Sequence, residues 1–374
     1  MGYVPHNLLI TGGAGFIGAN FVRHWLARGG EGRVIVLDAF TYAGNPQNLA
    51  GLERDARFEL VRGDICDEAL SEDLLRRHRI DCIVHFAAES HVDRSILGPD
   101  DFIRTNVVGT HALLKVARRC WLTQPIVPAH RFHHVSTDEV YGSLGPEDPP
   151  FHERTPYAPN SPYSASKAGS DHLVRAYRET YGLNTTLTNC SNNYGPYQFP
   201  EKLIPLLIVN ILAGKPLPVY GDGLQVRDWL HVQDHCRAID RVLQGGRAGE
   251  VYNIGGDGEI ANIELVKLLC GQMDDIFSRR PELREVFAES PPARGGRAAD
   301  LIVHVTDRPG HDRRYGIDHR KARSELGYMP SFDLRRGLAD TIDWYLTNQD
   351  WWQSLLGPDY ARWVQANYAA RTAR

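Results

Sequence analysis

A glycine-rich turn directly after a short apolar run constrains the fold of this chain more than any other feature. The run Leu8–Thr11 leads into Gly12-Gly13-Ala14-Gly15-Phe16-Ile17-Gly18, and an amphipathic stretch follows. Gly12, Gly15 and Gly18 stand where the backbone must turn tightly between a strand and a helix and let a ligand approach closely. Unpaired N–H groups at the helix start favour an anion there without a lysine. The turn therefore predicts a unit that holds phosphate groups.

Short β-rich apolar runs alternate with longer amphipathic stretches through the first half of the chain. Phe16–Arg28 and Asp101–Arg119 place apolar residues at helical spacing and supply the crossovers that parallel strands require. This rhythm predicts an α/β protein with a doubly wound parallel (Rossmann) sheet. The expected strands are Leu8–Thr11, Val34–Asp38, Phe58–Val61, Cys82–Phe86, Phe132–Ser136, Thr185–Asn189 and Val251–Ile254.

The composition changes after Asn189, where glycines and prolines interrupt the alternation of strands and helices. We expect residues 1–190, with 228–256 returning to the main sheet, to form the Rossmann domain. Residues 191–227 and 257–374 are expected to form a smaller substrate-binding lobe with a C-terminal helical cap. The length of 374 residues suits one large domain with such a lobe.

Two parts of the lobe have a distinctive composition. Arg279–Asp300, which is charged and rich in Pro, Gly and Ala, is expected to be an exposed insertion. The aromatic C-terminal region is expected to pack as a helical cap rather than to stack on nucleic-acid bases. Its tryptophans are Trp344, Trp351, Trp352 and Trp363.

Asp38 ends the second expected strand, where an acid can accept hydrogen bonds from both ribose hydroxyls of a dinucleotide. The same charge would repel a 2′-phosphate, and the three residues that follow include no arginine to bind one. The pattern therefore predicts NAD rather than NADP. A turn cap is the alternative role of Asp38. Asp64-Ile65, after the third strand, suits contact with the adenine ring, although it could also be only a cap.

Tyr163-Ser164-Ala165-Ser166-Lys167 places a tyrosine and a lysine at positions i and i+4, which lie one above the other on a helix face. A phenol with a pKa near 10 is a poor base at neutral pH. A neighbouring ammonium and an oxidised nicotinamide both favour its phenolate. Downstream of a dinucleotide turn, Tyr163 is therefore predicted to take a proton from a sugar hydroxyl while a hydride leaves the same carbon.

These motifs resemble the extended short-chain dehydrogenase/reductase family, and the match runs over nearly the whole chain. Within that family the likeness is to nucleotide-sugar 4,6-dehydratases. Val135-Ser136-Thr137-Asp138-Glu139-Val140-Tyr141-Gly142 carries it, because relatives that only epimerise or oxidise lack the Asp-Glu pair. Supporting matches are Ala87-Ala88-Glu89-Ser90-His91-Val92-Asp93, Asn192-Asn193-Tyr194-Gly195-Pro196, Glu201-Lys202-Leu203-Ile204-Pro205, Arg227-Asp228-Trp229 and Asp307-Arg308-Pro309-Gly310-His311-Asp312.

The resemblance implies removal of water from a nucleotide-linked glucose, with thymidine diphosphate as the expected carrier. Oxidation at C4 makes the hydrogen on C5 acidic, so Glu139 can remove that proton. Asp138, kept protonated by apolar and acid-rich surroundings, would protonate the departing C6 hydroxyl. Thr137 would hydrogen-bond the C4 oxygen. The hydride then returns to C6, which leaves a 4-keto-6-deoxy sugar and an oxidised cofactor.

The resemblance also assigns binding residues and an assembly. Arg227 and His311, far apart in sequence, are expected to converge on the diphosphate, and the chain is expected to form a homodimer through the helices around Asp101–Arg119 and Tyr163–Tyr181. The implied cofactor residues are Gly12, Gly15, Phe16, Ile17, Gly18, Asp38, Thr41, Asp64, Ile65, Ala87, Ala88, Ser90, Thr105, Tyr163, Lys167 and Asn193. The implied substrate residues are Ser90, Thr137, Asn192, Lys202, Leu203, Pro218, Tyr220, Arg227, Asn262, Arg308 and His311.

The remaining composition favours a cytoplasmic enzyme without a metal. The net charge of −4 offers no broad basic face for nucleic acid, and no apolar stretch is long enough to span a bilayer. The six cysteines form no CxxC pair, so reduced and mostly buried thiols are expected. His231 and His235 have ligand spacing but no glutamate between them in an HExxH arrangement, which argues against zinc.

Other functions of the same fold remain open at this point. A 4-epimerase or decarboxylase would use Tyr163 and NAD identically, but it would not need Asp138 and Glu139. A dehydratase acting on another nucleotide sugar would keep all of these residues. A catalytically idle NAD-binding regulator would have little reason to retain Tyr163, Lys167 and both acids.

Overall fold

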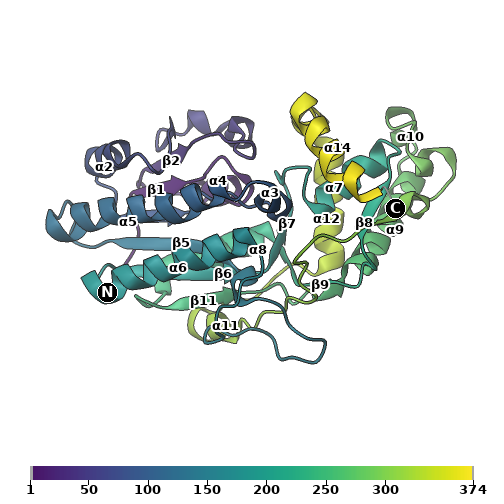
Figure 1. The fold of residues 1–374 in the computed structure, drawn as a ribbon. Helices are drawn as coiled ribbons and strands as arrows, with labels where there is room; N and C mark the ends of the chain where they lie inside the picture. Colours follow the sequence, from purple (N-terminus) through teal and green to yellow (C-terminus); the bar gives the residue numbers. More distant parts are fainter. Residues whose placement is uncertain (1–2, 373–374) are drawn as a thin grey trace.

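The computed structural model describes residues 3–372, and the side chains up to residue 368. Seven parallel strands form the main sheet in the order β11-β6-β5-β4-β1-β2-β3 (Figure 1). Their bounds are β1 Leu8–Thr11, β2 Val34–Asp38, β3 Phe58–Arg62, β4 Cys82–His85, β5 Arg131–Thr137, β6 Thr185–Cys190 and β11 Val251–Ile254. The doubly wound sheet and its seven expected strands are confirmed, with ends that shift by one residue at most.

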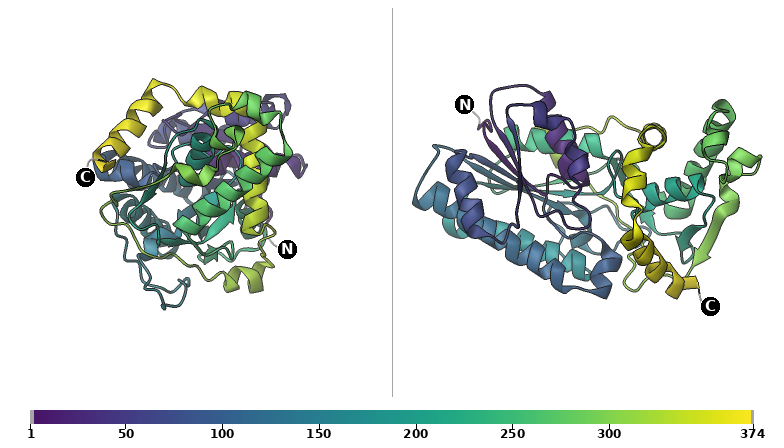
Figure 2. Two further views of the ribbon diagram at one scale, coloured as in Figure 1. Left: turned by 90° about the vertical axis from the view of Figure 1, so that its right-hand side faces the viewer. Right: turned by 90° about the horizontal axis from the view of Figure 1, so that it is seen from above.

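Helices cover both faces of this sheet because successive strand residues point to opposite sides. Leu8 and Ile10 of β1 pack in a core with α1 (Phe16–Ala27) and α8 (Val232–Gly245). Leu9 packs in a second core on the other face, beneath helices that lie opposite α1 and α8 (Figures 1 and 2). Those helices are α2 Glu68–Arg77, α5 Thr110–Arg118 and α6 Pro162–Tyr181.

The stretch expected as one helix over Asp101–Arg119 is divided into three parts. A short α4 (Asp100–Phe102) leads into the wider turns of a π-helical segment, Ile103–Gly109, before α5 begins at Thr110. Such wide turns are rare and often occur at functional sites. Thr105 lies in this segment, and a smaller helix, α3 (Val92–Leu97), precedes it.

A third core, separate from the two sheet cores, defines the lobe beyond the carboxyl ends of the strands (Figure 1). Tyr194, Leu265, Ile342 and Trp351 are among the side chains buried there. The helices of the lobe are α7 Leu203–Leu212, α9 Asn262–Arg279, α10 Leu283–Val286, α12 Leu334–Thr347, α13 Gln349–Leu355 and α14 Pro358–Thr372. Its strand pairs are β7 Asn192–Tyr194 with β10 Trp229–His231, β8 Leu217–Tyr220 with β13 Ile302–Val305, and β9 Val226–Arg227 with β12 Ile260–Ala261.

The region 279–300 is largely exposed, as its composition suggested, but it is also packed on the lobe core. It forms α10 and short 3₁₀ turns, and it buries Leu283, Phe287 and Ala298 in the lobe core. Burial of a large apolar side chain stabilises the folded state by roughly 1.5–3 kcal/mol. This gain holds the region on the lobe core although charged residues surround the buried ones. The packed aromatic cap is as expected, since Trp351 and Trp352 are both buried.

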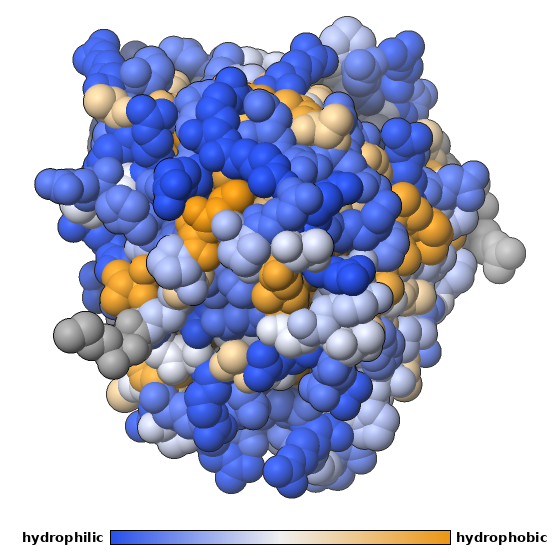
Figure 3. Space-filling model, turned by 90° about the vertical axis from the view of Figure 1, so that its left-hand side faces the viewer, coloured by the Kyte–Doolittle hydropathy of each residue, from blue (hydrophilic) through white to orange (hydrophobic). Residues whose placement is uncertain are grey.

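The remaining surface features are unremarkable for a large α/β enzyme. A further helix, α11 (Arg320–Leu326), packs against α8 and β11. The face opposite the lobe is mainly hydrophilic with small, separate apolar patches (Figure 3). No helix within residues 3–372 combines the length and apolarity needed to cross a bilayer. All six cysteines are free, and five of them are buried.

Candidate active site

A cavity of about 310 Å³ opens at the carboxyl ends of the main strands, next to the lobe. The strand order reverses here, because β1 lies between β2 and β4, and open α/β sheets bind ligands at such a point. Every residue that the sequence assigns to the cofactor lines this cavity. Residues from seven different segments of the chain thus converge on one space.

The glycine turn leaves no room for side chains on its inner surface. Gly12 has φ +69°, and a Cβ there would lie 2.5 Å from the backbone nitrogen of Ala87. A Cβ on Gly18 would overlap the carbonyl oxygen of Gly12. Gly15 is the N-cap of α1, no side chain caps the helix, and its first turn contains no acid. The N–H groups at the start of α1 are therefore available to an anionic ligand.

Asp38 stabilises the glycine turn by hydrogen bonds and also lines the cavity. Its carboxylate accepts hydrogen bonds from the backbone N–H groups of Ala14 (2.9 Å) and Phe40 (2.8 Å). Burial raises the pKa of Asp38, and these two hydrogen bonds oppose the rise. The capping role that the sequence left open therefore coexists with a position on the cavity wall. The uncapped helix start and this acid fit a dinucleotide without a 2′-phosphate.

The start of α6 fixes the Tyr-Lys pair. Ser161 caps the helix in a reciprocal capping box with Ser164, and Pro162 occupies the first helical position. Tyr163 and Lys167 are both buried, and the ammonium of Lys167 donates to the carbonyl oxygen of Val135 at 2.9 Å. The cap and the strand carbonyl thus hold the pair against the end of β5.

The chain by itself does not lower the pKa of Tyr163. Burial raises that pKa well above its usual value, and the negative charges of Glu139 and Asp138 raise it further. Lys167 offers its proton to a carbonyl oxygen, and burial lowers its own pKa. The sequence assigned the stabilisation of the phenolate to Lys167 and an oxidised nicotinamide together, and the residues of the chain alone do not supply it.

The two acids at the end of β5 have different environments. Asp138 is fully buried, and burial raises its pKa well above the usual value, with the charges of Glu139 and Asp228 adding to the rise. This agrees with the predicted protonated acid. Glu139 lines the cavity, whereas Asp138 does not. The hydroxyl of Thr137 lies between them, since it donates to Asp138 Oδ1 and accepts from the Glu139 N–H, both at 3.3 Å.

Burial and nearby cations shift the pKa of Glu139 in opposite directions. Burial raises its pKa, and the positive charges of Arg308, Lys202 and Arg227 oppose that rise. Each of these cations comes from the lobe or its entrance. The lobe therefore helps to keep the cavity carboxylate ionised.

The predicted substrate residues fall into two groups. Ser90, Thr137, Asn192 and Lys202 line the cavity together with the cofactor residues. Outside its wall lie Leu203, Pro218, Tyr220, Arg227, Asn262, Arg308 and His311.

Several residues of the second group contact one another beside the cavity. The rings of Tyr220 and His311 lie 6.0 Å apart, and the Tyr220 hydroxyl donates to Asp93 at 2.9 Å. Arg308 pairs with the same Asp93 at 3.5 Å. Arg227 donates to the carbonyl oxygen of Asp312 at 2.9 Å. These contacts join β8 and β9 to the 307–312 segment, and Arg227 and Arg308 are bound there to protein oxygens.

Comparison with known proteins places this geometry in a family. The family described as GDP-mannose 4,6 dehydratase matches residues 9–341. A dTDP-glucose 4,6-dehydratase of Xanthomonas campestris pv. campestris (strain B100) is 57% identical over 354 residues, which are 94% of this chain and 96% of that protein. The chain belongs to the dTDP-glucose 4,6-dehydratase family. The family predicted from the motifs is confirmed.

Solved structures of the dTDP-glucose 4,6-dehydratase family have the same fold. DesIV of Streptomyces venezuelae, a dTDP-glucose 4,6-dehydratase with NAD and TYD bound, is 49% identical and superimposes with a TM-score of 0.82 over 93% of this chain and 99% of that one. The enzyme from Bacillus anthracis, in complex with NAD, is 44% identical with a TM-score of 0.80, covering 94% and 99% of the two chains.

Some residues of this family site were not singled out from the sequence. Tyr42, Glu89, Phe199 and Glu201 line the cavity as well. Glu89 and Glu201 stand inside motifs that carry the family resemblance, next to residues assigned to binding. Their position in those motifs was the available signal. Glu201 is buried and bonds to Arg94 at 3.0 Å, so it also ties the cavity entrance to α3.

Proposed function

We propose that this chain is an NAD-dependent dTDP-glucose 4,6-dehydratase, a hydro-lyase that forms dTDP-4-keto-6-deoxyglucose and water. The supporting observation is one cavity that gathers a dinucleotide turn, Tyr163, Lys167 and Glu139, with Asp138 buried directly behind. The identity of up to 57% with dTDP-glucose 4,6-dehydratases over nearly the whole chain supports the same substrate.

The first proposed step is removal of a proton and a hydride at C4 of the sugar. The glycine turn and Asp38 would hold NAD, which would supply the acceptor for this hydride and the source of its return to C6. Tyr163 accepts the proton from the C4 hydroxyl, and the positive charge of a bound oxidised nicotinamide would oppose the burial that raises its pKa. Thr137 hydrogen-bonds the C4 oxygen and steadies the charge that develops there.

Elimination then uses the two acids in opposite states. Glu139 removes the proton from C5, which the C4 ketone has made acidic, and the surrounding cations favour the carboxylate form that this step needs. Asp138, protonated through burial, gives its proton to the departing C6 hydroxyl. Glu139 afterwards returns a proton to C5. At the end of a turnover Tyr163 has gained one proton and Asp138 has lost one, so that a proton must pass from one to the other, directly or through water, before the next cycle.

The lobe is proposed to bind the nucleotide end of the substrate. Arg227, Arg308 and His311 would exchange their protein partners for the diphosphate, and Tyr220 would contact the base. We assign residues 1–190 with 228–256 to the NAD-binding domain and 191–227 with 257–374 to the lobe and cap. We propose that the enzyme works in the cytoplasm, where free cysteines stay reduced.

We further propose a homodimer that forms through the outer faces of α6 and of the helical segments over Asp101–Arg119. Ile103, Val108 and Tyr181 are large apolar side chains exposed on these helices. A second copy of the chain would cover them, as the family resemblance implies. Light scattering of the purified protein should give twice the mass of one chain. The variant Val108→Asp should give the mass of a single chain.

A 4-epimerase or decarboxylase of this fold is the main alternative activity. Such an enzyme would use Tyr163 identically but would leave the C6 hydroxyl in place. The pair Asp138-Glu139 favours dehydration, because burial raises the pKa of Asp138 well above its usual value, whereas nearby cations oppose the rise for Glu139 in the cavity.

Incubation with dTDP-glucose in deuterated water distinguishes these functions. We expect a 6-deoxy-4-keto product with deuterium at C5, detected by NMR and mass spectrometry. An epimerised sugar would instead support the alternative, and a sugar unchanged after long incubation would contradict both. Parallel incubations with UDP-glucose and GDP-glucose measure the nucleotide preference.

A further inference from the structure

Three ionisable side chains stand in one row on α6, and only two of them have a role in the proposed mechanism. Tyr163, Lys167 and Asp171 are spaced four residues apart, so that they lie on the same face of the helix. Their exposed fractions are 8%, 4% and 3%. Asp171 is thus a buried acid one turn beyond the lysine, on the side away from the tyrosine.

The carboxylate of Asp171 is held in place by neighbours from other segments. Its Oδ2 accepts hydrogen bonds from the hydroxyls of Ser136 (2.9 Å), at the end of β5, and Tyr157 (3.0 Å). His134 Nε2 lies 3.1 Å from Asp171 Oδ1 and 3.2 Å from Ser170 Oγ. Burial lowers the pKa of His134 well below its usual value, so this imidazole is neutral. These neutral neighbours hold the carboxylate of Asp171 in place, but they do not balance its negative charge.

The charge of Asp171 acts on Lys167, and it also raises the pKa of Tyr141, Tyr157 and Tyr163. Among charged groups, Lys167 has the largest lowering effect on the pKa of Asp171, ahead of His172. Burial lowers the pKa of Lys167, and two groups raise it. Asp171 has the larger effect, and Cys190 on β6 has the smaller one. Burial raises the pKa of Asp171 to about 6, so it is ionised at neutral pH.

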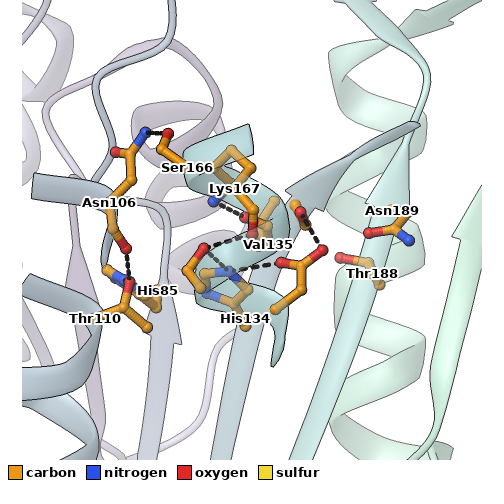
Figure 4. A network of polar contacts seen from close by, with 12 residues as sticks. His85, Asn106, Thr110, His134, Val135, Ser166, Lys167, Thr188 and Asn189 are labelled. Carbon is orange, nitrogen blue, oxygen red and sulfur yellow. Dashed lines mark hydrogen bonds and ion pairs between the residues drawn. The ribbon is translucent and has the colours of Figure 1, made fainter. Parts of the chain in front are cut away.

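The other groups that face Lys167 supply no negative charge at neutral pH. His85 on β4 and His134 on β5 are neutral, because burial lowers the pKa of each well below its usual value. Burial raises the pKa of the Cys190 thiol, so that the thiol stays protonated, and the residues of the chain alone also favour the protonated form of Tyr163. Lys167 itself points to the carbonyl oxygen of Val135, with His134 close beside it (Figure 4).

We propose that Asp171 is a positioning residue that keeps the buried ammonium of Lys167 charged and aimed at the end of β5. The proposal rests on the proposed function, in which Lys167 stands beside Tyr163 and the cofactor. A buried ammonium without a counterion would lose its proton at a lower pH. Because Asp171 also binds Ser136, next to Thr137, it joins the catalytic helix to the strand that carries the acids.

The isosteric variant Asp171→Asn tests this role. The amide oxygen can still accept from Ser136 and Tyr157, so the variant removes the charge and retains the contacts. We expect the alkaline limb of kcat to move to lower pH by about one to two units, because side chains four residues apart on a helix lie roughly 5–6 Å from one another and a charge at that range in an effective dielectric of about 20 has an effect of that size. On the acid side of that limb the rate should approach that of the wild type.

Tyr157→Phe is the matched control, since it removes one hydrogen bond from the carboxylate and keeps the charge. Its alkaline limb should coincide with that of the wild type. An unmoved limb in a folded Asp171→Asn enzyme would overturn the proposal, as would an equal shift in Tyr157→Phe.

A second measurement does not depend on turnover. The chain has six lysines, so the 13C resonance of each lysine Cε can be followed during a pH titration, with Lys167→Met assigning the resonance of interest. We expect Lys167 to titrate at lower pH in Asp171→Asn than in the wild type, and an identical titration would refute the role. If dTDP-glucose proves not to be the substrate, this titration still decides the question about Asp171.

Discussion

The cofactor cavity and the substrate lobe are built in different ways. Backbone forms the essential surface of the cavity, where Gly12 and Gly18 leave no space for a side chain and α1 begins without a cap. Charged side chains form the essential surface of the lobe, and they contact protein oxygens, as in the Arg308–Asp93 pair. The cavity is therefore fixed by topology, whereas binding in the lobe requires side chains to exchange partners.

This difference assigns different tasks to the two regions. A rigid backbone site suits a cofactor that stays bound through the reaction, because its donors cost no reorganisation. Exchangeable ion pairs suit a substrate that must enter and leave at every turnover. The two regions meet at Glu139, which lines the cavity, while cations of the lobe and its entrance oppose the rise of its pKa by burial.

The largest expected effect separates oxidation from elimination within the cavity. Glu139→Gln removes the base for C5 and leaves Tyr163 and Lys167 in place. We expect dehydration to fall by roughly 10²–10⁴-fold, the usual contribution of a general base, while oxidation of C4 still proceeds. Absorbance at 340 nm should then show reduced cofactor accumulating to at most one equivalent per active site.

An undiminished dehydration rate in Glu139→Gln would remove this residue from the mechanism. If the variant loses both the absorbance at 340 nm and the dehydration activity, the substitution disturbs the whole cavity. The division of roles between Tyr163 and Glu139 would then be wrong.

A smaller effect tests whether the lobe tunes the cavity. Burial raises the pKa of Glu139, and Arg308 is the first of the cations that oppose the rise. Glu139 must be ionised to act, so activity is lost as the pH falls through its pKa. Arg308→Met should raise that pKa and move the acid limb of kcat/KM to higher pH by about one unit. The profile of kcat/KM reports this group in the enzyme before substrate binds.

Arg313→Met is the matched control for this experiment. Arg313 belongs to the same segment but pairs with the exposed Asp222 at 2.9 Å, and it is not among the charges that act on Glu139. Its acid limb should stay in place. A shift of equal size in both variants would point to movement of the segment and would contradict electrostatic tuning.

The cavity was more predictable from the sequence than the lobe, for the same structural reason. Gly12, Gly15 and Gly18 stand between a strand and a helix in the spacing of a dinucleotide turn, and this spacing predicted the place of the cofactor residues. In the lobe, the charged and Pro-, Gly- and Ala-rich composition of residues 279–300 hid three apolar side chains that pack inward. Buried electrostatics were the least predictable, because the pKa of Tyr163 depends on burial and on acids brought near by the fold.

The smallest expected effect compares one helix cap in each region. Ser161 caps α6 two residues before Tyr163, and Asp333 caps α12 in the lobe by accepting from the Arg336 N–H at 2.9 Å. Loss of an N-cap destabilises a helix by about 1 kcal/mol. Ser161→Ala and Asp333→Ala should therefore lower the free energy of unfolding by similar amounts, measured by urea denaturation.

Their effects on catalysis should differ, because only one cap orders a catalytic side chain. Ser161→Ala loosens the first turn of α6, where Tyr163 lies, so kcat should fall several-fold. Asp333→Ala should leave kcat unchanged, since α12 contributes packing to the lobe core. Equal losses of kcat in the two variants would show that the lobe shapes the cavity as strongly as α6 does, and the separation of a topologically fixed cavity from an adaptable lobe would fail.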